Sequence, residues 1–413
     1  MKLEYILARR TAVEDRSSRS SVMMRIALLA VVIGLAVMIV TLSVIGGFRG
    51  EIYSSLRGFG ADVTLTHFSA TSLGDAEPVT YDSTFVESLR RVKGVESVAE
   101  YAIVGAMAKS GDNVTGLQLK GVASSYPTEW WQSRLVEGAL PDVGSPTRRK
   151  EILLSQATAE RLSLSVGDKV EMLFMEDERP RRDRFKLCGI YSTGLEEMDQ
   201  VFAVVDIRDL RRVASWEEEL ITGYDLLLSD VSHTKQVKQQ VEQICYESDN
   251  FELANIVARD LMEREPVIFD WLKAHNINAE VIIVILLCVL IFNMASAMLI
   301  MVLDRRATIG LLKAQGMRNS AIRRMFLIRA MMLFLRGAFW GNMIGIGLVV
   351  VQDVWHVVEL DASGYMLNFL PVSIEWWWIV ALNVGVLVVT LLMLLLPSYL
   401  VARISPSESL RYR

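Results

Sequence analysis

The sequence has few of the residues that build disulfide frameworks or metal sites. Its only cysteines are Cys188, Cys245 and Cys288, and Cys288 lies inside an apolar run. Three cysteines make no framework; a bond between Cys188 and Cys245 is open if their domain lies outside the cytoplasm, but nothing in the sequence requires it. The four histidines are isolated from one another and from the cysteines, which argues against a metal site.

Motifs for nucleotide binding and for covalent catalysis are also absent from the sequence. No Gly-x-x-x-x-Gly-Lys-Ser/Thr loop occurs, so any nucleotide hydrolysis must come from another polypeptide. The middle of the chain offers no recognisable set of nucleophile and base. We therefore expect a chain that is not an enzyme and that binds no cofactor.

Apolar residues make up 52% of the chain and are concentrated in four blocks. The first, from Val22 to Ile45, is longer than the apolar core of a cleaved signal peptide (~7–15 residues) and lacks a cleavage site of small residues. The second, Val281–Leu303, has about 23 residues without a charge, enough to cross a bilayer as a helix. The third is Met325–Val351, and the fourth begins at Trp376. We predict four transmembrane helices.

The charges between these blocks predict the topology. From Asp304 to Arg324 there are six basic residues and one acid, whereas Asp353–Glu375 has acids and no Lys or Arg. Positive loops face the cytoplasm, so both termini should be cytoplasmic. The predicted parts are an amphipathic N-terminus (1–21), helix 1 (22–47), an outer domain (48–278), helix 2 (279–303), a cytoplasmic loop (304–321), helix 3 (322–352), an outer loop (353–375), helix 4 (376–398) and a cytoplasmic tail (399–413).

The sequence pattern of the outer domain predicts an α+β domain inserted between helices 1 and 2. We predict strands at 62–67, 98–108, 117–122, 170–174, 185–191, 202–205 and 224–228, and helices at 84–92, 157–162 and 235–246. Two segments share the order strand, helix, strand: 62–67, 84–92 and 95–103 in the first, and 224–228, 235–246 and 251–256 in the second. This order predicts two β-α-β halves of one subdomain (48–116 and 221–278), split by a mostly β insertion (117–220). Within the insertion, Ser165–Val170 is a turn leading into a strand, as in small β-barrels.

The third apolar block contains two charges and a regular glycine pattern. Arg329 lies near the cytoplasmic end and can extend to the interface. Arg336 lies ~10 Å deeper in a helix and needs a partner or a water-filled cavity. Gly337, Gly341 and Gly345 recur every fourth residue and predict close packing against another helix.

Two polar segments are candidate binding elements. In the cytoplasmic loop, Ile309, Leu311, Leu312 and Met317 form one apolar face of a short helix ended by Gly316, which favours docking of a soluble partner; the alternative is a plain turn, which needs only about two to eight residues. In the outer domain, Glu176–Asp183 is predicted to be a hairpin tip that is rich in both acidic and basic residues. A solvated turn and a binding finger are equally open there.

The order of these features resembles the MacB-like class (type VII) of ABC transporter membrane subunits and, more narrowly, the lipoprotein-releasing LolC and LolE family. The matching segments are Thr41–Phe48, Tyr191–Asp199, Phe292-Asn293, Ile309–Met317 and Pro397–Tyr412. Gly46 stands where the family usually has Asn, and Arg336 stands where it is usually apolar or small. The hairpin at 175–184 is shorter and more charged than the chaperone-recruiting hook of LolC, which favours a LolE-like role or one subunit serving both roles as a homodimer.

The resemblance implies a bacterial inner-membrane subunit that extracts lipoproteins and passes them to a periplasmic chaperone. Its partners would be a LolD-like ABC ATPase that binds ATP and Mg²⁺, a second LolC/LolE-like subunit, the lipoprotein cargo and a LolA-like chaperone, with no nucleic acid. The implied contacts are with cargo lipid for Met38, Ile39, Leu42, Ile45 and Phe48, with the ATPase for Ile309, Leu311, Leu312, Lys313, Gly316 and Met317, and with the chaperone for Glu178, Arg179, Pro180 and Arg181.

Two other functions remain alternatives. A MacB-like efflux permease carries its ATPase ahead of its first membrane helix, whereas only 21 residues precede that helix here. An FtsX-like subunit that signals to a cell-wall hydrolase typically has an outer domain much smaller than the roughly 230 residues of this one. Lipoprotein release is therefore the preferred prediction.

Overall fold

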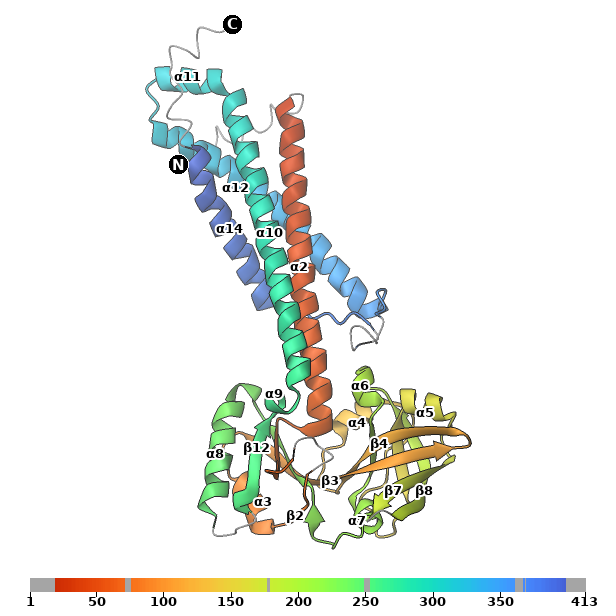
Figure 1. Ribbon diagram of the computed structural model, residues 1–413. Helices are drawn as coiled ribbons and strands as arrows, with labels where there is room; N and C mark the ends of the chain where they lie inside the picture. Colours follow the sequence, from red (N-terminus) through yellow and green to blue (C-terminus); the bar gives the residue numbers. More distant parts are fainter. Residues whose placement is uncertain are drawn as a thin grey trace. The chain divides into compact units, whose positions relative to one another are not determined.

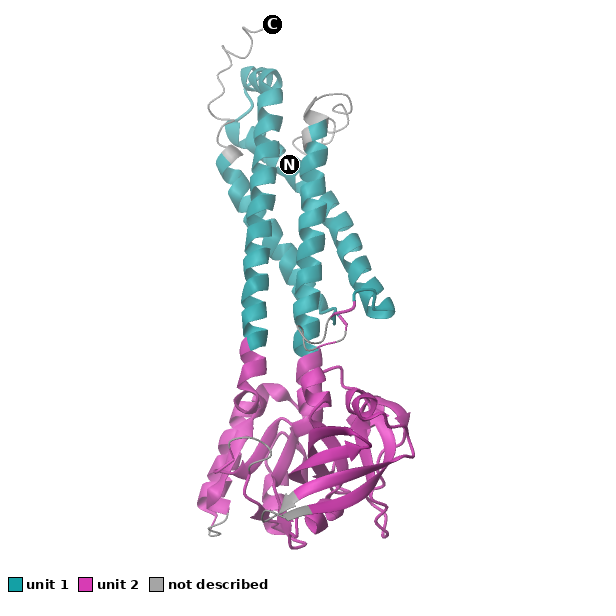
Figure 2. Cartoon of the chain, turned by 45° about the vertical axis from the view of Figure 1, so that its right-hand side comes forward, with its two compact units in different colours: residues 1–50, 271–358, 370–413 teal, residues 51–270, 359–369 magenta. Residues whose placement is uncertain are grey.

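The computed structural model describes residues 19–70, 76–176, 179–248, 253–360, 367 and 369–398. They form two compact units, coloured separately in Figure 2: a helical unit (1–50, 271–358 and 370–413) and a sheet unit (51–270 and 359–369). Helices α2 (Arg19–Gly60) and α10 (Pro266–Asp304) each contribute residues to both units. The predicted amphipathic N-terminus up to residue 18 and the predicted tail from residue 399 lie outside the described residues.

The helical unit contains the four long helices that the apolar blocks predict (Figure 1). Within the described residues, four helices are long and apolar enough to cross a membrane: Met24–Gly60, Pro266–Asp304, Asn319–Trp355 and Trp376–Leu396. The third lies in α12 (Asn319–Trp355) and the fourth in α14 (Trp376–Ser398). A short helix, α11 (Arg306–Ala314), joins α10 to α12.

The glycines of α12 pack against α2, which confirms the predicted close approach. A Cβ atom added at Gly337 would lie 2.6 Å from a side-chain atom of Val31, and one at Gly341 would lie 2.9 Å from the carbonyl oxygen of Val32. Distances this short leave no room for a side chain. The two backbones are therefore in contact along this face, as small residues allow in membranes.

Three polar residues of α12 lie in different surroundings. The Asn342 and Asn383 side chains exchange two hydrogen bonds of 2.8 Å, which join α12 to α14. Arg329 is buried within the helical unit, whereas Arg336 is exposed and has no ion pair with any described residue. Helical side chains lean toward the helix N-terminus, so Arg336 leans toward α11 and the end of the helix predicted to be cytoplasmic.

The sheet unit is built on one sheet of ten strands. Nine lie in the order β12-β1-β11-β3-β4-β9-β6-β8-β5, and β7 pairs with both β3 and β8. The strands predicted between residues 62 and 228 are all present, most of them a few residues longer. The strand predicted at 251–256 is wrong in position, because Leu253–Asn255 form a 3-10 turn and β12 begins only at Ile256. The strands are β1 (Val63–His67), β3 (Val95–Ser110), β4 (Asn113–Val122), β5 (Leu135–Gly138), β6 (Glu151–Ser155), β7 (Lys169–Glu176), β8 (Arg179–Tyr191), β9 (Phe202–Asp206), β11 (Gly223–Leu228) and β12 (Ile256–Asp260).

Part of this sheet closes into a barrel. Strand β3 pairs with β4, β4 with β9, β9 with β6, β6 with β8, β8 with β7, and β7 again with β3. The ring confirms the small barrel predicted from the turn at Ser165–Val170. It also corrects the expected separation of subdomain and insertion, because the long strand β3 belongs to the barrel and also pairs with β11.

Short helices cover the sheet, three of them at predicted places and one, α7, where none was predicted. They are α3 (Ser83–Arg90), α5 (Gln156–Leu162), α7 (Ile207–Val213) and α8 (Thr234–Glu247). Asp82 caps α3 through hydrogen bonds from Thr84 N and Phe85 N, as its position just before an apolar-periodic segment favours. The core beneath these helices is one continuous apolar cluster that includes Leu65, Val98 and Val205.

The segment between α12 and α14 also contributes to the sheet unit. Residues 359–369 belong to that unit, and Leu367 forms an isolated antiparallel bridge with Leu195. The Leu367 side chain is buried. Leu367, which lies in the predicted outer loop, is therefore anchored by its buried side chain and by its bridge to Leu195.

Candidate functional site

Helix α11 lies where the sequence predicts a short docking helix. It spans Arg306–Ala314 and is followed by Gly316, whose φ of 84° lies in the left-handed region that favours glycine. The Met317 amide donates a hydrogen bond to the Leu312 carbonyl. The predicted helix and its glycine stop are confirmed.

The apolar side chains of α11 point in two directions. Ile309 is fully buried in a core cluster with Ile322 and Phe326, and Leu312 and Met317 are partly buried against the same cluster. Leu311 is 51% exposed. The inward side chains hold α11 to its own chain, so Leu311 is the apolar side chain that α11 offers to a partner. Partial desolvation lowers the pKa of Lys313.

The five residues predicted to contact cargo lipid are not all accessible within this chain. Met38 and Ile39 are fully buried in the helical unit, and Phe48 packs against Trp271 with 6.0 Å between ring centroids. Leu42 and Ile45 line a cavity of about 390 Å³. The contact of Leu42 and Ile45 with a lipid chain remains a prediction, and this cavity gives that contact a defined place.

The cavity has an apolar and a polar part. Its apolar lining is Leu42, Ile45, Ile283, Trp378 and Ile379, and its polar lining is Ser43, Arg49, Asn276, Glu280, Ser373 and Glu375. Sequence reasoning identified Leu42 and Ile45 but missed the polar residues. Their signal was present: each charge stands just beyond the end of an apolar run, although only the fold shows that these ends meet.

The sequence analysis also missed a buried polar network at the end of α2, within the sheet unit. The Lys120 ammonium donates to Asp225 Oδ2 (2.6 Å), to Tyr126 Oη (2.8 Å) and to the carbonyl of Phe59. Lys120 is 2% exposed, and this desolvation lowers its pKa, while the Asp225 carboxylate opposes the change. Arg264 donates to the carbonyl of Gly60 (2.5 Å). Two cations thus meet the carbonyl end of α2, where the helix dipole favours them.

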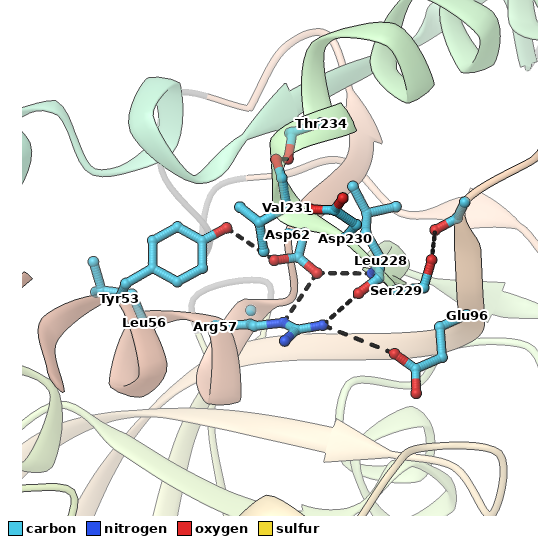
Figure 3. Close-up of polar contacts among 12 residues, drawn as sticks. Tyr53, Leu56, Arg57, Asp62, Glu96, Leu228, Ser229, Asp230, Val231 and Thr234 are labelled. Carbon is cyan, nitrogen blue, oxygen red and sulfur yellow. Dashed lines mark hydrogen bonds and ion pairs between the residues drawn. The ribbon is translucent and has the colours of Figure 1, made fainter. Parts of the chain in front are cut away.

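A second set of contacts fixes the last turn of α2, shown in Figure 3. Asp62 accepts hydrogen bonds from Tyr53 Oη (2.9 Å), Arg57 Nε (3.0 Å) and Leu228 N (2.7 Å), and Arg57 Nη2 donates to the Leu228 carbonyl (2.7 Å). The turn is therefore joined to β11 through both side chain and backbone.

Aromatic packing completes this attachment. The Phe59 ring lies 4.9–5.9 Å, between centroids, from four aromatic rings: Trp130, Trp131, Tyr191 and Phe202. A Cβ atom at Gly58 would lie 2.1 Å from the Trp130 ring, so this position has no space for a side chain. The end of α2 is held by charge, hydrogen bonds and apolar contact together. Such an attachment can transmit displacement or force.

The segment Tyr191–Asp199 lies beside the same end of α2. Thr193 donates to the Asp199 carboxylate through its hydroxyl (2.7 Å) and its amide (3.1 Å), and its carbonyl accepts from Ser55 Oγ (3.3 Å). Burial raises the pKa of Asp199 to about 6, and the hydrogen bonds from Thr193 act in the opposite direction. The segment is therefore a structural turn against α2.

The charged hairpin that was a candidate chaperone contact is described only in part. Glu178 lies outside the described residues, as do the side chains of Arg179 and Pro180. Arg181 donates to the Val213 carbonyl (3.1 Å) and to Ser215 Oγ (2.9 Å), so it packs on its own unit. The chaperone contact remains a prediction. The cysteines Cys188, Cys245 and Cys288 are free.

Two family models match the chain. The MacB-like periplasmic core domain matches residues 25–244, more than half of the chain, and the FtsX-like permease C-terminal domain matches residues 280–406. The first match covers the barrel and α2, and the second covers α10 to α14 with α11 between them.

Proteins similar to the whole chain are named as parts of one system. A lipoprotein-releasing system transmembrane protein LolC from Xylella fastidiosa is 23% identical over 99% of this chain and 97% of its own length. A LolE protein from Haemophilus influenzae is 21% identical over 92% of each chain. Among solved structures, the periplasmic region of MacB from Actinobacillus actinomycetemcomitans is 12% identical, with a TM-score of 0.34 over 52% of this chain and 95% of that one.

Proposed function

The chain belongs to the family defined by the MacB-like periplasmic core domain, and from this premise we propose that it is the membrane subunit of an ATP-driven lipoprotein-releasing complex. The observation that carries the proposal is the match of LolC and LolE proteins over nearly the whole chain, through both units. The subunit resides in the bacterial inner membrane. It moves cargo mechanically, and a separate ABC ATPase hydrolyses ATP.

The proposed topology places the sheet unit in the periplasm and α11 in the cytoplasm. The support is the charge of the segments: α11 and the residues around it are strongly basic, and the segment between α12 and α14 has no Lys or Arg. Both termini are then cytoplasmic. The proposed partners are a LolD-like ATPase at α11, a second membrane subunit and a LolA-like chaperone.

The sheet unit is proposed to contain two β-α-β halves, β1-α3-β3 and β11-α8-β12. Their support is that β1 lies between β11 and β12 in the sheet and β11 lies between β1 and β3. Both LolC and LolE proteins are similar to the chain. The LolE-like role or homodimer favoured by the short hairpin remains a proposal.

Force from the ATPase enters through α11 in this mechanism. Leu311 is the exposed apolar side chain, and Arg306 and Arg318 are exposed on the same segment. Movement of α11 is passed to α12 through Ile309, which is buried in the shared core. Helix α12 in turn packs against α2. The contacts of Lys120, Arg264 and Phe59 join the C-terminal end of α2 to the sheet unit. ATP-driven closure can then collapse a lipid-holding cavity.

The test is Leu311→Asp in the full chain, expressed with its ABC ATPase. A carboxylate in the docked interface would be desolvated without a partner, at a cost of several kcal/mol. We expect normal membrane insertion and unfolding temperature, loss of co-purification with the ATPase and loss of lipoprotein release. Leu311→Met keeps the apolar contact and is the matched control.

Leu312→Asp is not a suitable test, because that side chain packs against the chain's own core. If Leu311→Asp keeps a normal complex and full cargo-stimulated ATP hydrolysis, α11 is only a turn and the proposed coupling is wrong.

A further inference from the structure

The cavity lined by Leu42 and Ile45 lies at one end of three membrane-spanning segments. Its lining comes from the ends of helices: residues 42–49 of α2, 276–283 of α10, and 373–379, where α14 begins. The sheet unit, which the proposed topology places in the periplasm, begins after the first of these stretches and its main part ends before the second, which makes this the outer end of the membrane helices. Trp378 also lines the cavity, and tryptophan favours the level of lipid head groups.

Three charged residues of the lining lack an ion pair with any residue that the structure describes. They are Arg49, Glu280 and Glu375, and all three are exposed. At the edge of an apolar cavity these side chains can receive a ligand without breaking an existing ion pair. They carry one positive and two negative charges, so a ligand that pairs with all of them must carry both signs.

The hydroxyl of Ser373 is a second, independent sign of a missing ligand. Ser373 Oγ is a buried atom with no hydrogen-bond partner among the described residues, although the Ser373 amide donates to the Ser43 carbonyl (2.9 Å). Leaving a buried hydroxyl without a hydrogen-bond partner is unfavourable, because the group has lost its hydrogen bonds to water. A Cβ atom added at Gly46 would lie 2.5 Å from this oxygen and 3.5 Å from Glu375 Oε1, so the hydroxyl and the carboxylate lie on the same side of α2.

We propose that this cavity binds one outer-leaflet phospholipid whose head group carries a primary ammonium. In this arrangement Arg49 and Ser373 bind the phosphate and ester oxygens, Glu280 and Glu375 bind the ammonium, and an acyl chain lies against Leu42, Ile283 and Trp378. The volume of about 390 Å³ lies within the usual range for small-molecule pockets, about 300–1,000 Å³.

The charges of the lining distinguish this lipid from others. A phosphatidylglycerol head would bring a net negative charge to a lining that already has an excess carboxylate. A choline head has the right charges but no N–H to donate to Glu280 or Glu375. The triacylated end of a lipoprotein has an amide in place of an ammonium, so it uses the apolar wall only. The inference goes beyond lipoprotein release. It depends on that proposed function only for the placement of the chain in a membrane.

Lipid binding by the full-length protein tests this inference directly. The chain is purified in detergent, stripped of lipid and titrated with lyso-phosphatidylethanolamine, -choline and -glycerol of equal chain length, and bound lipid is counted by native mass spectrometry. We expect the ethanolamine lipid to bind about tenfold more tightly than the glycerol lipid, a factor that corresponds to one ordinary charge-assisted hydrogen bond.

Two pairs of variants locate the binding. Ile283→Trp fills the cavity and should abolish binding, whereas Val284→Trp, at an exposed neighbouring position of α10, should not. Combined Glu280→Gln and Glu375→Gln should remove the preference for ethanolamine, whereas Asp353→Asn, on a carboxylate outside the lining, should keep it. The second pair makes only isosteric changes, so it remains informative if Ile283→Trp fails to fold.

Three results would overturn the inference: equal binding of the three lipids, equal binding by Ile283→Trp and Val284→Trp, or an ethanolamine preference that survives loss of both glutamates. A synthetic tripalmitoyl-cysteinyl peptide distinguishes the cargo from the phospholipid. If it binds this cavity and the ethanolamine lipid does not, the inference is wrong, and lipoprotein release, measured separately, is unaffected.

Discussion

Helix α2 is held in two different ways along its length. In the helical unit it meets α12 through close contact at Gly337, Gly341 and Gly345, whose nearest neighbours on α2 are apolar side-chain and backbone atoms. In the sheet unit its last ten residues meet two cations, an aspartate and a cluster of aromatic rings. One helix thus has a smooth, apolar contact at one end and a specific, polar attachment at the other.

The two kinds of contact differ in their response to displacement. Glycine faces pack through dispersion alone, so a small sliding movement exchanges one set of contacts for a similar set. Buried hydrogen bonds and ion pairs are directional, and breaking one exposes an uncompensated group. Movement is therefore easier at the α2–α12 contact than at the end of α2, as the proposed transmission of force requires.

Among the substitutions that test this difference, Lys120→Met should have the largest effect on stability. The substitution leaves Asp225 buried without its cation, and we expect the free energy of unfolding of the sheet unit to fall by about 3–5 kcal/mol. Amide hydrogen exchange of the full chain in detergent should show faster exchange in β4 and β11 and unchanged exchange in α12 and α14.

The matched control is Lys120→Met combined with Asp225→Leu, which replaces the ion pair by apolar side chains and should recover much of the loss. Equal exchange in the single and the double variant would mean that Lys120 contributes only its volume.

The next largest difference between the two units should be in how their stability depends on pH. The folded-state pKa of Asp199 is about 6, above its ordinary value of 3.8, so folding favours the protonated carboxyl. Its contribution to stability is complete below about pH 4 and is lost as pH rises through about 6, a difference of up to about 3 kcal/mol. Asp199→Asn should abolish this part of the pH dependence.

Chemical denaturation of the full chain at pH 4.5 and pH 7, followed by a probe in the sheet unit, measures the effect. The difference in stability between Asp199→Asn and the parent chain should be more favourable to the variant at pH 7. A pH-independent difference would show that the carboxyl does not titrate in this range.

The glycine contact of the helical unit is tested by Gly341→Leu. Because the new Cβ would lie 2.9 Å from the Val32 carbonyl oxygen, α12 must move away from α2, at an expected cost of about 1–3 kcal/mol. The thermal midpoint in detergent should fall for Gly341→Leu and stay unchanged for Gly347→Leu, where a Cβ atom meets nothing within 4 Å. Equal effects of the two substitutions would exclude a specific contact.

The smallest expected effect is that of Asn383→Leu. It removes the two hydrogen bonds with Asn342, and such bonds in membrane helices contribute about 0.6 kcal/mol on average. We expect a loss of about 1 kcal/mol in the same thermal assay, partly recovered by adding Asn342→Leu. A loss as large as that of Lys120→Met would contradict the difference between the two units.

Sequence periodicity predicted the elements well, because their patterns are local. The apolar strand from Leu117 to Val122 is present, and so is the helix of Ala157–Leu162, which buries Thr158, Ala159 and Leu162 on one face. The glycines of α12 were predicted to pack closely because only small residues permit it. The closure of the barrel by β7 and β3 was indicated only by one turn, since pairing partners are not local.

The direction in which a side chain points, and the pairing of residues far apart in the sequence, were harder to predict. The apolar face of α11 was recognisable, but periodicity cannot tell whether Ile309 faces its own chain or a partner. Lys120 and Asp225 are separated by 105 residues and resemble any surface charges until the sheet places β4 near β11. The same is true of Arg49, Glu280 and Glu375, which only the meeting of three helix ends brings to one cavity.

The closed barrel imposes an order on biosynthesis. All strands of the ring lie between Val95 and Asp206, so the ribosome has delivered them before β11 or α10 exists. Strand β1 emerges earlier, but both of its neighbours in the sheet, β11 and β12, are made later. The barrel can therefore close while β1 still lacks partners. The bridge between Leu195 and Leu367 can form only after α12 has been synthesised.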